Sequence, residues 1–133
     1  MARILIIEDN PANMKLAVLL LQHAGHVALR AVDAETGMAT ARTMQPDLIL
    51  MDIQLPGMDG LTATALLKQD ASTAHIPIIA LTAMAMKGDQ ERSQIAGCDA
   101  YIAKPLRHAE LHAAIDHLLL APSSRRAGES TAE

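Results

Sequence analysis

The chain has 133 residues, half of them hydrophobic and only one aromatic, which suits one domain with its own core and is too short for two. Its formal charge of -4 and its scattered lysines and arginines exclude the basic surface that nucleic-acid binding requires. The single cysteine excludes an internal disulfide, and no apolar run reaches the length of a transmembrane helix or resembles a secretory signal. We therefore expect a cytoplasmic protein that binds neither nucleic acid nor membrane.

The first predicted elements are a buried strand and a helix. Residues 3–7 contain a continuous run of isoleucine and leucine, which is typical of a strand covered on both faces, and the run stops at the Glu-Asp-Asn of residues 8–10. Residues 12–24 then have helical composition and end at Gly25, a natural helix C-cap. Acidic residues thus follow directly on the first strand.

The next segment repeats this alternation. Residues 27–32 predict a weaker strand, and Asp33 can cap a helix that runs to about Met44. The apolar run of residues 48–51 predicts a further buried strand, which stops at Asp52. An acidic residue again ends a strand.

The second half continues in the same order after a loop rich in glycine and proline. The predicted elements are a helix over residues 61–69, a strand over 76–81, a helix over 88–96 and a strand over 100–103.

The last predicted helix covers residues 107–120 and has apolar side chains at i, i+3, i+4 and i+7, so that one face can pack. Pro122 should stop it, because proline lacks the N–H that a helix interior needs. The residues beyond carry no apolar anchors. We therefore expect a domain over residues 1–121 and a disordered tail over residues 122–133.

Five strands that alternate with five helices predict an α/β fold, with a parallel sheet and helices on both of its faces. In such sheets, ligands bind at the carboxyl ends of the strands. The order of the strands cannot be derived from the pattern alone.

Reactive side chains follow four of the five strands. They are Glu8 and Asp9, Asp52, Thr82 and Lys104. Three carboxylates at one edge of a sheet repel one another, and a hard divalent cation such as Mg²⁺ relieves this repulsion. A carboxylate beside Mg²⁺, with an ammonium and a hydroxyl group nearby, has the parts for phosphoryl transfer to an aspartate.

The motifs that carry these side chains resemble the signature of response-regulator receiver domains, the CheY-like superfamily, in order and spacing. The resemblance covers about residues 3 to 120. The matching stretches are Glu8-Asp9-Asn10, the run from Leu50 through Asp52 to Gly60, Ala80-Leu81-Thr82-Ala83 and Lys104-Pro105.

The resemblance implies a flavodoxin-like three-layer fold with strand order 2-1-3-4-5. It implies that Asp52 is the phosphoacceptor, with Lys104 beside it. It also implies that Asp9 binds Mg²⁺ directly, that Glu8 binds it through water, and that the carbonyl of Gln54 completes the protein ligands.

Family likeness further assigns Thr82 and Tyr101 to a conformational switch and suggests a cis peptide bond before Pro105. The implied donor is a histidine kinase or a histidine phosphotransfer protein, and the implied output is contact between a monomer or weak dimer and a downstream protein effector. Three further stretches are similar to stand-alone cell-division regulators of this family, and receivers fused to hybrid histidine kinases share them. They are residues 13–16, 75–77 and 85–89. A phosphorelay receiver excised from such a kinase is therefore the alternative.

The sequence argues against two other functions. A phosphatase of the dehalogenase type needs a second acid two residues after its nucleophile, where this chain has Gln54. A nucleotide-binding module needs a phosphate-binding glycine loop, which the sequence lacks.

The apolar run of residues 16–21 is either covered by loops or exposed as a docking surface.

Two further groups of side chains have a structural interpretation. His108 and His112 have the spacing of a zinc-binding pair, but the sequence shows no third ligand, so we interpret them as part of a solvated helix face. Four aspartates at turns or helix starts should accept hydrogen bonds from free backbone N–H groups. These are Asp33, Asp47, Asp59 and Asp99.

Overall fold

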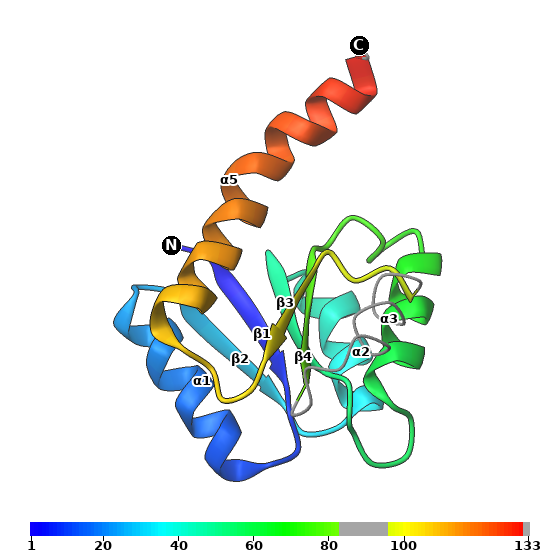
Figure 1. Cartoon of the computed structure of the whole chain (residues 1–133). Helices are drawn as coiled ribbons and strands as arrows, with labels where there is room; N and C mark the ends of the chain where they lie inside the picture. Colours follow the sequence, from blue (N-terminus) through cyan, green and yellow to red (C-terminus); the bar gives the residue numbers. More distant parts are fainter. Residues whose placement is uncertain (83–95, 132–133) are drawn as a thin grey trace.

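A five-stranded sheet lies between two layers of helices in the computed structural model, which describes residues 1–82 and 96–131 (Figure 1). The strands are β1 (Arg3–Ile7), β2 (Val27–Ala31), β3 (Leu48–Asp52), β4 (Ile78–Thr82) and β5 (Ala100–Ala103). The helices of the described part are α1 (Pro11–His23), α2 (Ala34–Met44), α3 (Gly60–Gln69) and α5 (His108–Thr131).

All neighbouring strands run parallel, in the order β2-β1-β3-β4-β5. This confirms the predicted α/β class and the flavodoxin-like order that the resemblance implied. Because each strand returns in the same direction through a crossover, the carboxyl ends of all five strands share one edge of the sheet.

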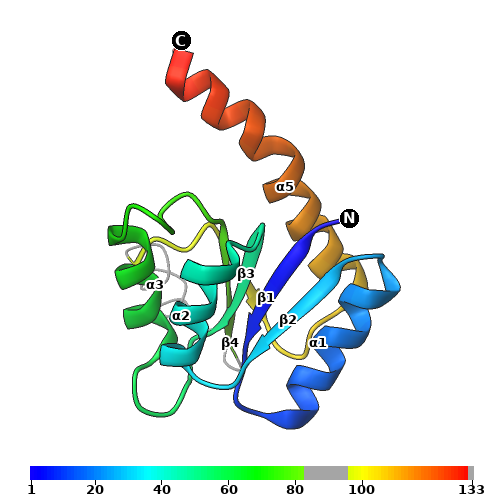
Figure 2. The same cartoon turned by 180° about the vertical axis from the view of Figure 1, so that it is seen from behind.

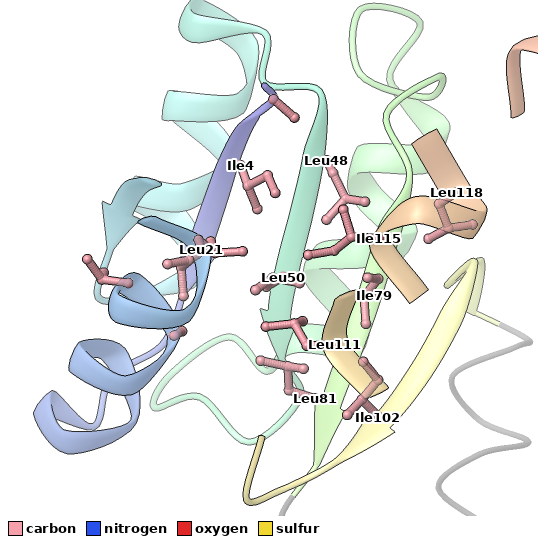
Figure 3. Close-up of a cluster of buried hydrophobic side chains, with 14 of the residues drawn as sticks. Ile4, Leu21, Leu48, Leu50, Ile79, Leu81, Ile102, Leu111, Ile115 and Leu118 are labelled. Carbon is pink, nitrogen blue, oxygen red and sulfur yellow. The ribbon is translucent and has the colours of Figure 1, made fainter. Parts of the chain in front are cut away.

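The core has two parts, one on each face of the sheet. α1 and α5 cover one face, and α2 and α3 cover the other, as the two opposite views show (Figures 1 and 2). Figure 3 shows how leucine and isoleucine side chains of α1 and α5 meet those of the central strands. β3 and β4 are buried at every residue, which explains why their sequences are continuous apolar runs without alternation.

The four aspartates predicted to be structural all accept a hydrogen bond from a backbone N–H group. Asp33 and Asp59 cap α2 and α3, through Thr36 N and Thr62 N. Asp47 and Asp99 instead bind the starts of strands, through Arg3 N at 2.8 Å and Ile78 N at 2.8 Å. The prediction is confirmed, although two of these carboxylates connect different elements and do not cap helices.

The structure differs from the sequence prediction near the C-terminus. α5 continues past Pro122 to Thr131, whereas a helix ending near residue 120 was predicted. The second half of this helix extends away from the body of the domain (Figure 1). An apolar pattern marks only the part of a helix that packs against a core, so the pattern could not predict where α5 ends. The division between a domain over residues 1–121 and a tail over residues 122–133 stays a prediction.

Two further predictions concern one helix of the second half and the possibility of a membrane-spanning helix. The helix predicted over residues 88–96 lies outside the described residues, apart from Ala96. Among the described helices, none combines the length and apolar character needed to cross a membrane.

Candidate functional site

The candidate site lies at the carboxyl edge of the sheet. Asp52 ends β3 and is paired with Leu81, the residue before Thr82 at the end of β4. Thr82 is paired in turn with Ala103, the last residue of β5, so Lys104 emerges beside it. Parallel pairing therefore brings together side chains that are up to about 100 residues apart in sequence.

Lys104 joins two buried carboxylates. Its Nζ lies 2.7 Å from Glu8 Oε1 and 3.1 Å from Asp52 Oδ2. Glu8 and Asp52 are each only 2% exposed. The peptide bond between Lys104 and Pro105 is cis, as the resemblance implied.

Backbone N–H groups hold the other oxygens of these two carboxylates. Asn10 N donates to Glu8 Oε2 at 3.1 Å, and Gln54 N donates to Asp52 Oδ1 at 2.9 Å. Each donor lies two residues after its acceptor, in the loop that follows the strand. Both carboxylates are therefore fixed on one side by the loop and on the other by Lys104.

The site carries more negative than positive charge. Burial raises the pKa of Asp52 to about 6; Gln54 N and Lys104 act in the opposite direction, while the Glu8 carboxylate adds to the rise. Burial opposes the charge of Lys104, but its hydrogen bond to Glu8 and the charge of Asp52 outweigh this and raise its pKa. One ammonium thus does not neutralise the acidic group.

Carboxylate oxygens of Glu8, Asp9 and Asp52 lie within 4.8 Å of one another. Asp9 is exposed, whereas the other two are buried, so the trio opens to solvent on one side. Hard oxygen donors at this spacing, with unrelieved repulsion on Asp52, fit a hard divalent cation such as Mg²⁺. Glu8, Asp9 and Asp52 are the side chains that could hold it.

The remaining predicted residues occupy different positions. Thr82 is buried at the end of β4, and its carbonyl accepts a hydrogen bond from Lys104 N at 2.6 Å. Gln54 lies next to the acidic group, with an exposed side chain and its N–H on Asp52. Tyr101 is half-buried in β5 in register with Ala80, and so lies along the strand and not at its carboxyl end.

Sequence reasoning missed two features of the site. It placed Lys104 next to the phosphoryl group only, whereas the shorter of its two ammonium–carboxylate distances is the one to Glu8. It also treated Gly60 only as a loop residue, although a Cβ on Gly60 would lie against the carbonyl oxygen of Asp52 and 2.7 Å from Cα of Ile53. The position of Gly60 in the run after Asp52 was the available signal.

An apolar groove of about 520 Å³ borders the acidic group. α1 supplies Lys15, Val18 and Leu19, and Val32 follows directly on the end of β2. Leu19 is 54% exposed and Val32 is 60% exposed. Of the two interpretations of the apolar run in α1, the structure therefore favours partial exposure.

Comparison with known proteins gives a consistent result. The family model described as the response regulator receiver domain matches residues 4–116. The polar-differentiation response regulator DivK of Brucella anthropi is 50% identical over 103 residues, which span 77% of this chain and 84% of the relative.

Solved structures agree with this relationship. A putative response regulator from Chloroflexus aurantiacus superposes with a TM-score of 0.87 at 29% identity, over 90% of this chain and 98% of its own. The receiver domain of a sensor histidine kinase from Pseudomonas aeruginosa has a TM-score of 0.83 at 36% identity, over 89% and 97% of the two chains, and contains a magnesium ion coordinated in its active-site cleft.

Proposed function

Because this chain belongs to the response-regulator receiver family, we propose that its Asp52 accepts a phosphoryl group from a histidine kinase or a histidine phosphotransfer protein. The observation that carries the proposal is the placement of Asp52 between Lys104 and the Glu8–Asp9 pair. In the transfer, the bond between phosphorus and the donor's histidine nitrogen breaks, and a bond forms between phosphorus and a carboxylate oxygen of Asp52.

The surrounding residues have separate roles. Gln54 N holds Asp52 Oδ1 in place, and Lys104 stabilises negative charge on the phosphoryl oxygens. The Thr82 hydroxyl donates to the phosphoryl group. Asp9, Asp52 and the Gln54 carbonyl would hold Mg²⁺ directly and Glu8 would hold it through water, and the ion would neutralise charge that develops on the phosphoryl oxygens.

Incubation with acetyl phosphate and Mg²⁺, followed by intact mass measurement, tests the proposal. We expect a phosphate-sized gain in the wild type and none in Asp52→Asn, because the amide nitrogen and oxygen are poor nucleophiles. Asp59→Asn, which changes the same group at the cap of α3, should keep the gain. Equal labelling of wild type and Asp52→Asn would reject Asp52 as acceptor.

The phosphorylated domain signals by binding a downstream protein. Phosphorylation draws Thr82 inward and shifts the population of Tyr101 conformers at the face formed by β5 and α5, together with a helix expected over residues 88–96. The DivK relative consists mostly of the matched domain, since the match spans 84% of its length. This favours a stand-alone regulator over a hybrid-kinase relay receiver. The proposed regulator is cytoplasmic and acts as a monomer or weak dimer.

The groove beside the acidic group is the proposed docking site for the phosphodonor. Its exposed apolar side chains, Leu19 on α1 and Val32 after β2, suit the apolar face of a partner helix, and the groove opens next to Asp9. We expect Leu19→Glu to slow transfer from the cognate kinase at least about tenfold, which corresponds to about 1.4 kcal/mol of lost docking. Labelling by acetyl phosphate should be unchanged.

Leu66→Glu is the matched control, because Leu66 is 40% exposed on α3, on the opposite face of the sheet. It should leave both reactions unchanged. An unchanged transfer rate in Leu19→Glu would remove the docking proposal.

We further propose that the domain catalyses its own dephosphorylation only slowly. Met84 follows Thr82 by two residues and offers no acid or amide to orient a hydrolytic water; it lies outside the described residues. Loss of the phosphate-sized mass after removal of acetyl phosphate should take minutes or longer with Mg²⁺ present. Met84→Glu should accelerate the loss, and decay of the wild type within seconds would contradict the proposal.

A further inference from the structure

Three histidines meet where α1 ends and α5 begins. The ring centroids of His108 and His112 are 4.3 Å apart, and those of His23 and His108 are 6.5 Å apart. His108 and His112 share one face of α5 at i, i+4 spacing, whereas His23 is the last residue of α1. Both views show the end of α1 beside the start of α5 (Figures 1 and 2).

One ring nitrogen in this cluster lacks a partner. His112 Nε2 is buried, and within the described part of the chain it has no hydrogen-bond partner. A buried polar atom of this kind normally binds something, because leaving it unpaired costs about 1–3 kcal/mol. The cluster therefore has an unused ligand atom.

We propose that His23, His108 and His112 form a binding site for a borderline transition-metal cation, best matched by Zn²⁺, that joins α1 to α5. Imidazole nitrogen is the ligand that Zn²⁺ shares with Cu²⁺ and Ni²⁺, and an i, i+4 histidine pair on a helix is a recurring half of such sites. The sequence contained this pair, and the fold supplies the third ligand from α1.

The rings lie near this geometry, although the ligand atoms of the three histidines do not all lie within 4.8 Å of one another. Two imidazoles on one tetrahedral Zn²⁺, with Zn–N distances of about 2.0–2.1 Å, place their ring centroids about 5 Å apart. The two separations observed here lie on either side of this value. His23 and His108 are exposed, so rotation of their side chains closes the difference without repacking the core.

The chemistry of the cluster separates it from the carboxylate site. Burial, followed by the neighbouring His108, His26 and His23, lowers the pKa of His112, so its ring is in the neutral form that binds metal. Oxygen ligands at Glu8, Asp9 and Asp52 suit Mg²⁺, whereas these nitrogen ligands do not. Excess Mg²⁺ should therefore occupy one site and leave the other available.

Calorimetric titration of the full chain with ZnCl₂, in a large excess of Mg²⁺, tests the proposal. We expect one Zn²⁺ per chain and a rise in melting temperature with added Zn²⁺. His23→Gln and His112→Gln should each weaken binding at least about tenfold, a loss that even outer-shell partners of a metal can cause. His117→Gln, an exposed histidine of the same helix, should bind like the wild type.

His23→Gln is the decisive variant, because it removes the ligand from the other helix and lies at an exposed position where folding is not at risk. Unchanged affinity in His23→Gln would show a chelate of α5 alone and overturn the proposal. Two other results would also overturn it: no binding in excess Mg²⁺, or binding only by chains that sedimentation shows to have dimerised.

Discussion

Replacing Asp52 with Asn should stabilise the domain by about 2 kcal/mol at pH 7 when divalent cations are absent. The pKa of Asp52 rises from its ordinary 3.8 to about 6 in the folded chain, chiefly because the carboxylate is buried. Since one pKa unit corresponds to about 1.4 kcal/mol, keeping this group ionised in the fold costs on the order of 2–3 kcal/mol. An amide avoids this cost.

The dependence on pH has a definite sign. Between about pH 3.8 and 6 the folded chain holds a proton on Asp52 that the unfolded chain has released, so the stability of the wild type falls as the pH rises. The advantage of Asp52→Asn should therefore be absent below pH 3.8, grow through this window and be complete near pH 7.

Urea unfolding of both proteins in EDTA at several pH values measures this difference, and the melting temperature at pH 7 should rise by roughly 5–10 °C. Asp116→Asn, the same change at an exposed position on α5, should alter stability by less than about 0.5 kcal/mol. Adding Mg²⁺ should stabilise the wild type more than Asp52→Asn. A variant less stable than the wild type at pH 7 without cations would refute this account.

The predicted gain in stability also bears on function. In a protein that transfers no phosphoryl group, one carboxylate would be enough to pair with Lys104, and apolar side chains would fill the rest of the pocket. Here Glu8, Asp9 and Asp52 lie together with one lysine, and the raised pKa of Asp52 indicates that the excess charge costs stability. Sites that bind cations or transfer groups commonly carry such a cost.

The sheet and the acidic edge could be predicted because the evidence for them is local. Each buried strand is a continuous apolar run, and each run ends at a charged or hydroxyl-bearing residue, as at Ile7 before Glu8 or at Asp52 itself. Since parallel strands share a carboxyl edge, convergence of these side chains followed from the alternation alone. The order of the strands required the family resemblance, because no local signal distinguishes the edges of the sheet.

Features that depend on distances between elements could not be predicted from local patterns. The pairing of Lys104 with Glu8 joins residues at opposite ends of the chain, and the approach of His23 to His108 depends on how two helices pack. The predicted end of α5 was wrong, because the apolar period describes only the part of a helix that packs against the core.

Replacing Gly60 with Ala should destabilise the domain by about 3 kcal/mol, the upper part of the usual range for overpacking. Gly60 begins α3 where the helix approaches the end of β3, and Gly60 N donates to the Ile53 carbonyl at 3.2 Å. A Cβ there would press on backbone atoms of Asp52 and Ile53, and backbone in a central strand cannot move aside as a side chain can.

The same displacement should move the carboxylate. Asp52 is held by Gln54 N and Lys104 at hydrogen-bond distances, and small shifts in a transfer site can reduce rates about 100-fold. Gly60→Ala should thus lose stability in urea and label more slowly with acetyl phosphate, even at temperatures where it is fully folded.

Gly57→Ala separates steric contact from backbone strain, because it makes the same change three residues earlier, in the loop before α3. Gly57 has φ of 73°, and a Cβ there meets nothing within 4 Å, so only the left-handed backbone should cost stability, by about 1 kcal/mol. Gly60 has no such φ, and its larger cost must come from contact with β3. If both variants lost the same stability, or if Gly60→Ala kept the wild-type labelling rate, close packing of α3 against the end of β3 would not be the constraint that fixes Asp52.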